Sequence, residues 1–185
     1  MKKNKISIII VGIMMLFVVT LLFTQSDNTE AFLKKYNINE KDIKDIVAIL
    51  EERTDESNLF NAGITGSHLI MSDDQTEVKM ELPSDLFYLS IAPYINQTHP
   101  CGIHNLVTCR GELKNQEFTV VVVNKDTNEV VFQEQVITAS NGFLGVWLPK
   151  NIEGVITVST SDLSASTSIS TGENDNTCLT TLQLS

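Results

Sequence analysis

The residue types best suited to metal or redox chemistry gather in one short stretch of this sequence. Eleven residues contain two cysteines and two histidines, namely His99, Cys101, His104 and Cys109. A proline and a glycine flank the first cysteine, a pattern typical of a turn. A turn can direct successive side chains towards one centre, whereas a strand points them alternately to two faces. The third cysteine, Cys178, comes far later in the sequence, so only folding could bring it alongside.

Thiolates and imidazoles are soft to borderline ligands, which suit Cu(I), Zn(II) and, transiently, Cu(II). Three thiols and two imidazoles are more donors than Cu(I) requires, and the surplus would serve redox chemistry. A cysteine pair releases two electrons when it forms a disulfide, enough to reduce two Cu(II) ions. The third cysteine and a histidine would then retain the Cu(I) product. The residue types therefore indicate a site that binds and reduces copper.

Two other interpretations of these residues stay open at this level. A disulfide between Cys101 and Cys109 would close a loop, with Cys178 as a small buried residue, because spaced cysteines in exported proteins usually pair. A structural zinc site is the second alternative, although the seven residues between Cys101 and Cys109 do not match the usual zinc-finger spacings. The disulfide alternative leaves the neighbouring histidines without a role.

The start of the chain indicates export. Three lysines, Lys2, Lys3 and Lys5, precede an almost wholly apolar run of 18 residues from Ile6 to Phe23. Such a run is typical of a Sec-type signal and has the minimum length of a membrane-spanning helix. No small-x-small cleavage site follows, which favours an uncleaved anchor, and the positive-inside rule places the rest outside the cytoplasm. We therefore predict that residues 1–28 are a signal peptide or membrane anchor of an extracytoplasmic protein, membrane-anchored or secreted.

The net charge and the number of cysteines exclude some classes of function. Without the three N-terminal lysines, ten basic and 23 acidic residues remain, a net charge near −13. Such an acidic protein argues against nucleic-acid binding, which needs clustered Lys and Arg. Exported proteins usually carry an even number of cysteines in disulfides, so a third cysteine indicates a thiol with another role.

The remaining sequence begins with a helical segment. We predict a helical N-terminal segment over residues 29–66, with a short helix at 31–36 and an amphipathic helix that Asn39 would cap. The apolar residues at helical spacing in the second helix are Ile43, Ile46, Val47 and Leu50. Residues 55–66 are rich in turn formers and mark the boundary of this segment.

From His68 onward, apolar and polar residues alternate in short runs separated by turn formers. Residues 118–123 and 130–137 flank the turn-forming sequence NKDTN and predict a hairpin. The Ser/Thr-rich stretch 161–170 also alternates with apolar residues, which favours a half-exposed strand over a low-complexity stalk. Short strands at this spacing predict a mainly β fold, a small antiparallel β-sandwich. We assign residues 67–185 to this β-rich copper-binding domain.

Four segments carry a resemblance to a known family. They are YLSIAPYINQT, HPCGIHNLVTCRGEL, NGFLGVWLP and the closing NDNTCLTTLQL. On these segments, the chain from Asp73 to the end resembles the CueP family of copper-binding periplasmic and cell-envelope proteins. The resemblance implies a copper-resistance protein with cupric-reducing ability, which holds copper through its cysteines and an adjacent histidine. The better-known members are periplasmic, whereas the N-terminal run of this chain suggests tethering to a membrane.

Mapped onto this sequence, the resemblance implies copper ligands at Cys101, Cys109, Cys178 and His104, with His99 as a neighbouring donor. We take Cys101 and Cys109 as the redox pair, although any two of the three cysteines could bridge. Zinc could substitute for copper, and a copper-receiving extracytoplasmic protein would be a further partner; the oligomeric state stays open. The competing interpretation is a disulfide-stapled cell-surface β-sandwich that serves as an interaction module without metal function.

Overall fold

The structure, a computed structural model, describes residues 28–53 and 60–185. The signal or anchor predicted at residues 1–28 lies almost wholly outside these ranges. Within them, no helix combines the length and the apolar character needed to cross a membrane.

The chain divides into two compact units, residues 1–39 and 40–185. The first contains a helix at residues 28–35, and the turn that follows it ends at Asn37 with a positive φ of 56°. Asparagine tolerates this left-handed conformation better than most residues. Among the described residues, the second unit contains helix α2, all the strands and every residue of the site.

Helix α2 (Ile43–Glu51) begins the second unit, and Asp42 caps it. The Asp42 carboxylate accepts a hydrogen bond from the Lys44 backbone N–H at 2.9 Å. We predicted the cap three residues earlier, at Asn39, and the structure corrects this. Both residue types cap helices, but an aspartate also places negative charge at the positive end of the helix dipole. The apolar residues that the helix buries are Ile46, Val47 and Leu50.

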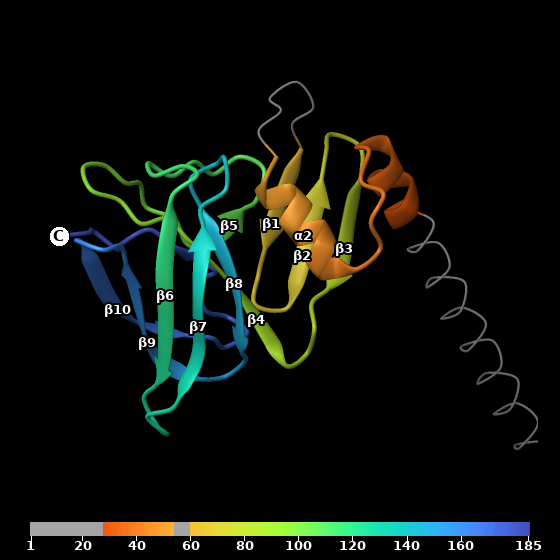
Figure 1. The fold of residues 1–185 in the computed structure, drawn as a ribbon. Coiled ribbons are helices and arrows are strands. Elements are labelled where there is room, and N and C mark those ends of the chain that lie inside the picture. Colours follow the sequence, from red (N-terminus) through yellow and green to blue (C-terminus); the bar gives the residue numbers. More distant parts are fainter. Residues whose placement is uncertain (1–27, 54–59) are drawn as a thin grey trace, which may run out of the picture. The chain divides into compact units, whose positions relative to one another are not determined.

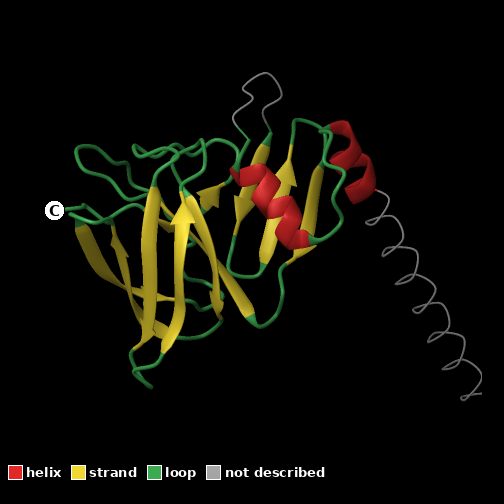
Figure 2. Ribbon diagram, in the orientation of Figure 1, coloured by secondary structure: helices red, strands yellow, loops and turns green. Residues whose placement is uncertain are grey.

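The strands of the described residues form three sheets (Figures 1 and 2). The first, in the order β3-β2-β1-β5, consists of β1 (Asn61–Ile64), β2 (His68–Ser72), β3 (Glu77–Glu81) and β5 (His104–Asn105). The second, in the order β10-β9-β6-β7, consists of β6 (Glu117–Asn124), β7 (Val130–Ile137), β9 (Glu153–Ser159) and β10 (Ser164–Ser170). The third, in the order β11-β4-β8, consists of β4 (Leu86–Ile91), β8 (Leu144–Pro149) and β11 (Cys178–Leu179).

The second and third sheets pack together around one apolar core. Alternate residues of their strands point into it, among them Phe87, Leu89, Phe118, Val120, Leu148 and Ile156. Two sheets that share a core in this way form a β-sandwich. The predicted mainly β fold with antiparallel sheets is therefore confirmed. The hairpin predicted around NKDTN is β6–β7, and the alternating stretch at 161–170 contains β10.

Strand β4 is buried on both faces, so its side chains that point away from the sandwich core are also shielded from water. Its odd-numbered residues point into the sandwich core, so Tyr88 and Ser90 point away from it. Both are polar and buried, with Ser90 fully so. A buried polar side chain requires a hydrogen-bond partner. Both side chains donate to the carboxylate of Glu51, the last residue of α2.

Residues 61–64 form β1, although we predicted turns across residues 55–66. The buried side chains of β1 are Ala62 and Ile64, which alternate with an asparagine and a glycine. Because asparagine and glycine are also common in turns, the alternation of buried and less buried residues in this short strand could not be distinguished from a turn in the sequence. β1 pairs with both β2 and β5, so these pairings join residues on the two sides of the boundary that we predict between residues 66 and 67.

We expect Gly145→Ala in β8 to destabilise the fold. A Cβ atom at Gly145 would overlap the Tyr88 side chain and displace its hydroxyl from Glu51. Such overpacking typically costs about 1–3 kcal/mol of unfolding free energy. Gly63→Ala in β1 is the matched control, because a Cβ there would meet its nearest atom, on Ile103, at 3.9 Å. Denaturant unfolding compares the two, and equal stabilities of the two variants would contradict this packing.

Candidate metal centre

A disulfide joins Cys101 to Cys178. Cys101 lies in the loop after β4, Cys178 begins β11, and their Cα atoms are 5.6 Å apart. β11 runs parallel to β4 and places Cys178 opposite Ser90. The Cys178 backbone N–H also donates to the Gly102 carbonyl at 3.1 Å. The strand and the loop are therefore held together by a backbone hydrogen bond as well as by the disulfide.

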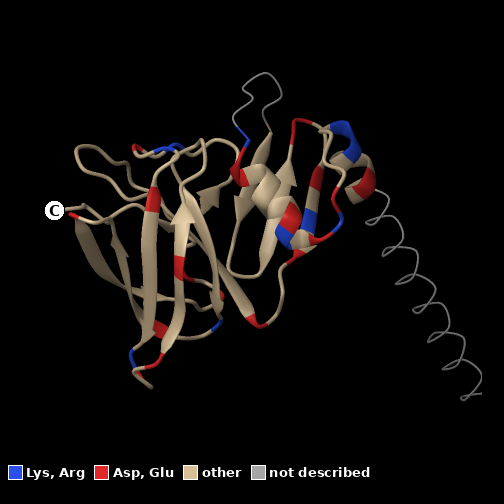
Figure 3. Ribbon diagram, in the orientation of Figure 1, with Lys and Arg blue, Asp and Glu red and all other residues tan. Residues whose placement is uncertain are grey.

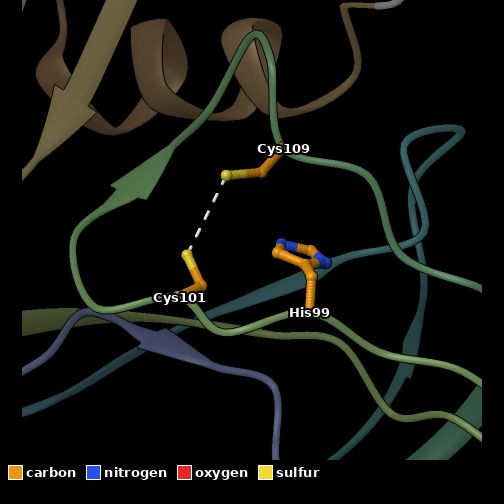
Figure 4. A group of neighbouring side chains, drawn as sticks. All are labelled: His99, Cys101 and Cys109. Carbon is orange, nitrogen blue, oxygen red and sulfur yellow. Dashed lines mark hydrogen bonds between the residues drawn. The ribbon is translucent and has the colours of Figure 1, made fainter.

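This bridge differs from the Cys101–Cys109 pair that we took from the sequence. The Cys101–Cys178 bridge depends on the parallel pairing of β11 with β4. This pairing joins segments that lie far apart in the sequence, so no local sequence pattern predicts it. Cys109 keeps a free thiol, yet its Sγ lies only 3.9 Å from that of Cys101 (Figure 4). The assignment of the redox pair stays a prediction.

A tight turn after β5 presents the Cys109 thiol. The Asn105 carbonyl accepts from the Cys109 N–H at 3.0 Å, and the Asn105 side chain accepts from the backbone N–H groups of Val107 and Thr108. The Arg110 guanidinium donates to the carbonyls of Val107 and Cys109 at 2.7 and 2.8 Å. These local hydrogen bonds fix the position of the thiol outside any helix or strand.

His104 is fully buried at the start of β5. Its backbone N–H donates to Thr177 Oγ1 at 3.1 Å, and that hydroxyl donates to the Ile64 carbonyl at 2.6 Å. Its Nδ1 lies 3.6 Å from Cys178 Sγ, and its Nε2 lies 3.1 Å from the nearer carboxylate oxygen of Glu51. A carboxylate carries no hydrogen, so Nε2 donates to Glu51, and Nδ1 faces the Cys178 sulfur.

The charges of His104 and Cys109 support each other. Burial lowers the pKa of His104, but hydrogen bonds with Cys109 and Glu51 outweigh it and raise the pKa from 6.5 to about 9. Burial raises the pKa of Cys109, but hydrogen bonds from the His104 side chain and the Asn105 backbone outweigh it and lower the pKa below 9.0. The thiolate is the form that binds metals. Metal binding must displace the competing protons and therefore weakens as the pH falls.

His99 lies shortly before Cys101 on the same loop, and its ring is directed towards the Cys101 and Cys109 sulfurs (Figure 4). The ring packs edge-on against Phe143, with the two centroids 6.3 Å apart. The His104 ring packs against the same phenyl ring at 4.4 Å. A single buried aromatic side chain therefore contacts both imidazoles.

The five predicted donors form two groups that share Cys101. The outer group is His99, Cys101 and Cys109, all partly exposed, and the inner group is Cys101, His104 and Cys178, of which the last two are buried. The donor atoms of each group lie within 4.8 Å of one another. Sulfur and imidazole donors at this separation suit Cu(I) once reduction of the disulfide makes its sulfurs thiolates.

Glu112 holds the loop that leads to His99. Its carboxylate accepts hydrogen bonds from the backbone N–H groups of Ile95, Asn96 and Gln97 at 2.7 to 3.4 Å. These hydrogen bonds, led by that from Ile95, lower the pKa of Glu112 below its ordinary value. The Glu112 carboxylate belongs to neither donor group, yet it positions the loop that carries His99 of the outer group.

We expect Glu112→Gln to loosen this loop in a pH-dependent way. Because the folded-state pKa is depressed, the carboxylate stabilises the loop above the ordinary Glu pKa of about 4.3, and this contribution is lost as the pH falls through the lower folded-state pKa. At neutral pH the variant should therefore show faster amide exchange at residues 95–97, with the difference disappearing in acid. Glu117→Gln, an exposed glutamate of β6, is the control. Identical exchange in both variants at neutral pH would contradict the role of Glu112.

Glu51 belongs to this centre, although the sequence pattern did not single it out. It is 5% exposed, and its carboxylate receives side-chain hydrogen bonds from Tyr88, Ser90, His104 and Asn141. A signal was present in the sequence. Glu51 comes four residues after Val47 and directly after Leu50, so it extends the apolar stripe of α2, where a charged residue is unusual.

Charged side chains are spread over the described part of the chain. Figure 3 shows Asp and Glu on α2, on strands and in loops, with Lys and Arg scattered among them. The whole sequence has 23 acidic and 13 basic residues, a net charge of −10. A protein with this excess of negative charge attracts cations and repels polyanions.

Comparisons with known proteins agree on one family. The family model described as "Periplasmic copper-binding protein CueP" matches residues 45–183, which include all five donors and Glu51. A solved structure titled "Crystal Structure of S.CueP" is 39% identical to this chain and superposes with a TM-score of 0.78. The match covers 84% of this chain and 96% of that one. No curated protein matches the chain.

Proposed function

This chain belongs to the CueP family of periplasmic copper-binding proteins, and on that premise we propose that it captures copper outside the cytoplasm and reduces Cu(II) to Cu(I) in copper resistance. The observation that carries the proposal is the position of the Cys101 sulfur. It belongs to both donor groups, is bonded to Cys178 and lies 3.9 Å from Cys109 Sγ. A cysteine so placed can bind copper and can also form a disulfide when copper oxidises it.

In the redox step, two thiolates give up one electron each, and each electron reduces one Cu(II) ion. Its products are two Cu(I) ions and one S–S bond, so the electrons balance. The Cys101–Cys178 disulfide would be one product of such a step. A Cys101–Cys109 bridge, the pair predicted from the sequence, is the alternative product because these two sulfurs also lie close together.

The donors that the disulfide leaves free would retain Cu(I). When Cys101 and Cys178 are bridged, the Cys109 thiolate and the His99 imidazole of the outer group remain available. When the protein is reduced, all three thiolates and His104 are available as well. Because more soft donors bind Cu(I) more tightly, the reduced form should have the higher Cu(I) affinity.

We expect Cu(II) mixed with reduced protein to yield two Cu(I) ions per chain and to consume two of the three thiols. A Cu(I)-specific chromophoric chelator and a thiol-reactive dye measure the two quantities in the absence of oxygen. Peptide mapping by mass spectrometry identifies the bridge formed. Cys109→Ser keeps the Cys101–Cys178 pair and should reduce the same amount of Cu(II). Thiol counts that do not change in the wild-type protein would contradict the proposed reduction.

An extracytoplasmic location agrees with the description of the family and with the disulfide, which persists in oxidising compartments. We further propose that residues 1–28 either tether the protein to a membrane or are removed on export. N-terminal sequencing of the exported protein distinguishes the two. The Cu(I) would pass to a copper-receiving extracytoplasmic protein, and zinc could occupy the same donors because thiolate and imidazole also suit Zn²⁺.

A disulfide-stapled interaction module is the second candidate function, and the Cys101–Cys178 bridge itself favours it. In such a module the bridge would be permanent and the sulfurs would serve only to hold β11 against the loop. The module predicts a Cu(I) affinity of the reduced protein no higher than that of a variant without cysteines. Competition with a chromophoric chelator separates the two functions.

A further inference from the structure

The Glu51 carboxylate lies at the centre of a buried polar cluster that the proposed redox step does not use. Donors reach it from β4, from β5 and from the loop between β7 and β8. They are Tyr88 Oη at 3.2 Å, Ser90 Oγ at 3.1 Å, His104 Nε2 at 3.1 Å and Asn141 Nδ2 at 3.2 Å. Across residues 28–53 and 60–185, no buried side-chain nitrogen or oxygen is left without a partner. The cluster is therefore fully satisfied.

The position of Glu51 makes a purely structural role costly. Burial removes the carboxylate from water, and the C-terminal end of α2 already carries the negative end of the helix dipole. The last turn of α2 has no basic residue to offset this charge. A glutamine has a single accepting oxygen, so it could accept from Ser90 and Asn141 but would turn an N–H towards Tyr88. What the second carboxylate oxygen adds is an acceptor for Tyr88 and for Nε2 of His104.

The other donors fix the carboxylate before the imidazole reaches it. Ser90 and Asn141 donate to Oε1, and Tyr88 donates to Oε2, so neither oxygen is free to turn away. The Nε2 of His104 then lies 3.1 and 3.2 Å from the two oxygens. Rotation of the ring would break these contacts. The ring is therefore held with its other nitrogen, Nδ1, on the side of the sulfurs.

We propose that Glu51 is a positioning residue for copper ligation: it keeps a proton on Nε2 of His104 and so directs Nδ1 at the sulfurs of the inner group. The inference rests on the proposed function, because it concerns how the same centre binds copper. Histidines that bind metals commonly donate their second N–H to an outer partner, which sets the orientation of the ring. Removal of such partners typically weakens metal binding by about 10- to 100-fold.

The first test compares the Cu(I) affinities of Glu51→Gln, Glu52→Gln and wild-type protein, each as the full reduced chain. Glu52 is the adjacent exposed glutamate, so its substitution removes the same charge without touching the cluster. Competition with a chromophoric chelator should show about tenfold weaker binding for Glu51→Gln and no change for Glu52→Gln. Equal affinities in all three proteins would overturn the inference and leave the proposed function intact. A wild-type protein that binds no Cu(I) would overturn the proposed function itself.

The second test reads the imidazole directly and separates positioning from stability. Long-range ¹H–¹⁵N spectra of Cu(I)-loaded wild-type protein should show His104 protonated at Nε2 and bound to copper through Nδ1. In Glu51→Gln, the Nε2 proton should exchange faster with water. The opposite ring, protonated at Nδ1 and bound through Nε2, would overturn the inference from the wild-type protein alone. This measurement decides the matter even where Glu51→Gln does not fold.

Discussion

Replacing Cys101 by serine is expected to weaken Cu(I) binding more than either other cysteine substitution, and by more than the roughly 10- to 100-fold typical for loss of an outer partner of a metal ligand. Cys101 contributes its sulfur to both donor groups, so its loss leaves each group with a single sulfur. Cys109→Ser removes a sulfur from the outer group only, and Cys178→Ser removes one from the inner group only. Each of these variants therefore keeps one complete group.

Competition titrations of the three variants under reducing, oxygen-free conditions measure these effects without interference from the disulfide. Cys178→Ser is the best control, because it abolishes the same disulfide as Cys101→Ser while the outer group stays complete. Far-UV circular dichroism verifies that each variant retains its β structure. Equal losses of affinity in Cys101→Ser and Cys178→Ser would contradict the sharing of one sulfur by both groups.

Reducing the Cys101–Cys178 disulfide is expected to lower the free energy of unfolding by about 4 kcal/mol. The bridge joins residues 77 positions apart, and a cross-link that closes a long loop restricts the unfolded chain strongly. Cys109 takes no part in the bridge. Cys109→Ser should therefore lose the same stability on reduction as the wild-type protein.

Guanidinium unfolding of oxidised and reduced protein measures this difference. Cu(I) should restore part of it in the reduced protein, because a ligand of the folded state stabilises that state. At free Cu(I) about a hundred times the dissociation constant, the gain is about 2.7 kcal/mol. A loss on reduction below about 1 kcal/mol would show that the bridge does not constrain the chain as its loop length implies.

Alternating runs, β-branched runs and turn formers together predicted most strands of the sandwich. The run at 130–137 has the limits of β7, and the run at 118–123 lies within β6, whose buried and partly exposed residues alternate. A β-branched run that ends at turn formers is typical of a strand, even though Val121 and Val123 are apolar on the more exposed face of β6. β1 escaped this pattern because its buried residues are interleaved with Asn61 and Gly63, residue types that equally indicate a turn.

The chemistry of the centre could be predicted from residue types, but its connections could not. Ligand chemistry depends on thiols and imidazoles, which the sequence shows directly. The pairing of β11 with β4 depends on backbone hydrogen bonds that any residue can form, so nothing in the sequence places Cys178 opposite Ser90. Glu51 is similar, because its donors come from segments between 37 and 90 residues away.

One oxygen-free titration tests most directly whether the three cysteines bind Cu(I). Reduced wild-type protein and a variant with Cys101, Cys109 and Cys178 all replaced by serine are each added to the Cu(I) complex of a chromophoric chelator. We expect the wild-type protein to withdraw Cu(I) and bleach the complex, and the variant to leave its absorbance unchanged. Equal absorbance in the two titrations would contradict a copper function for this centre.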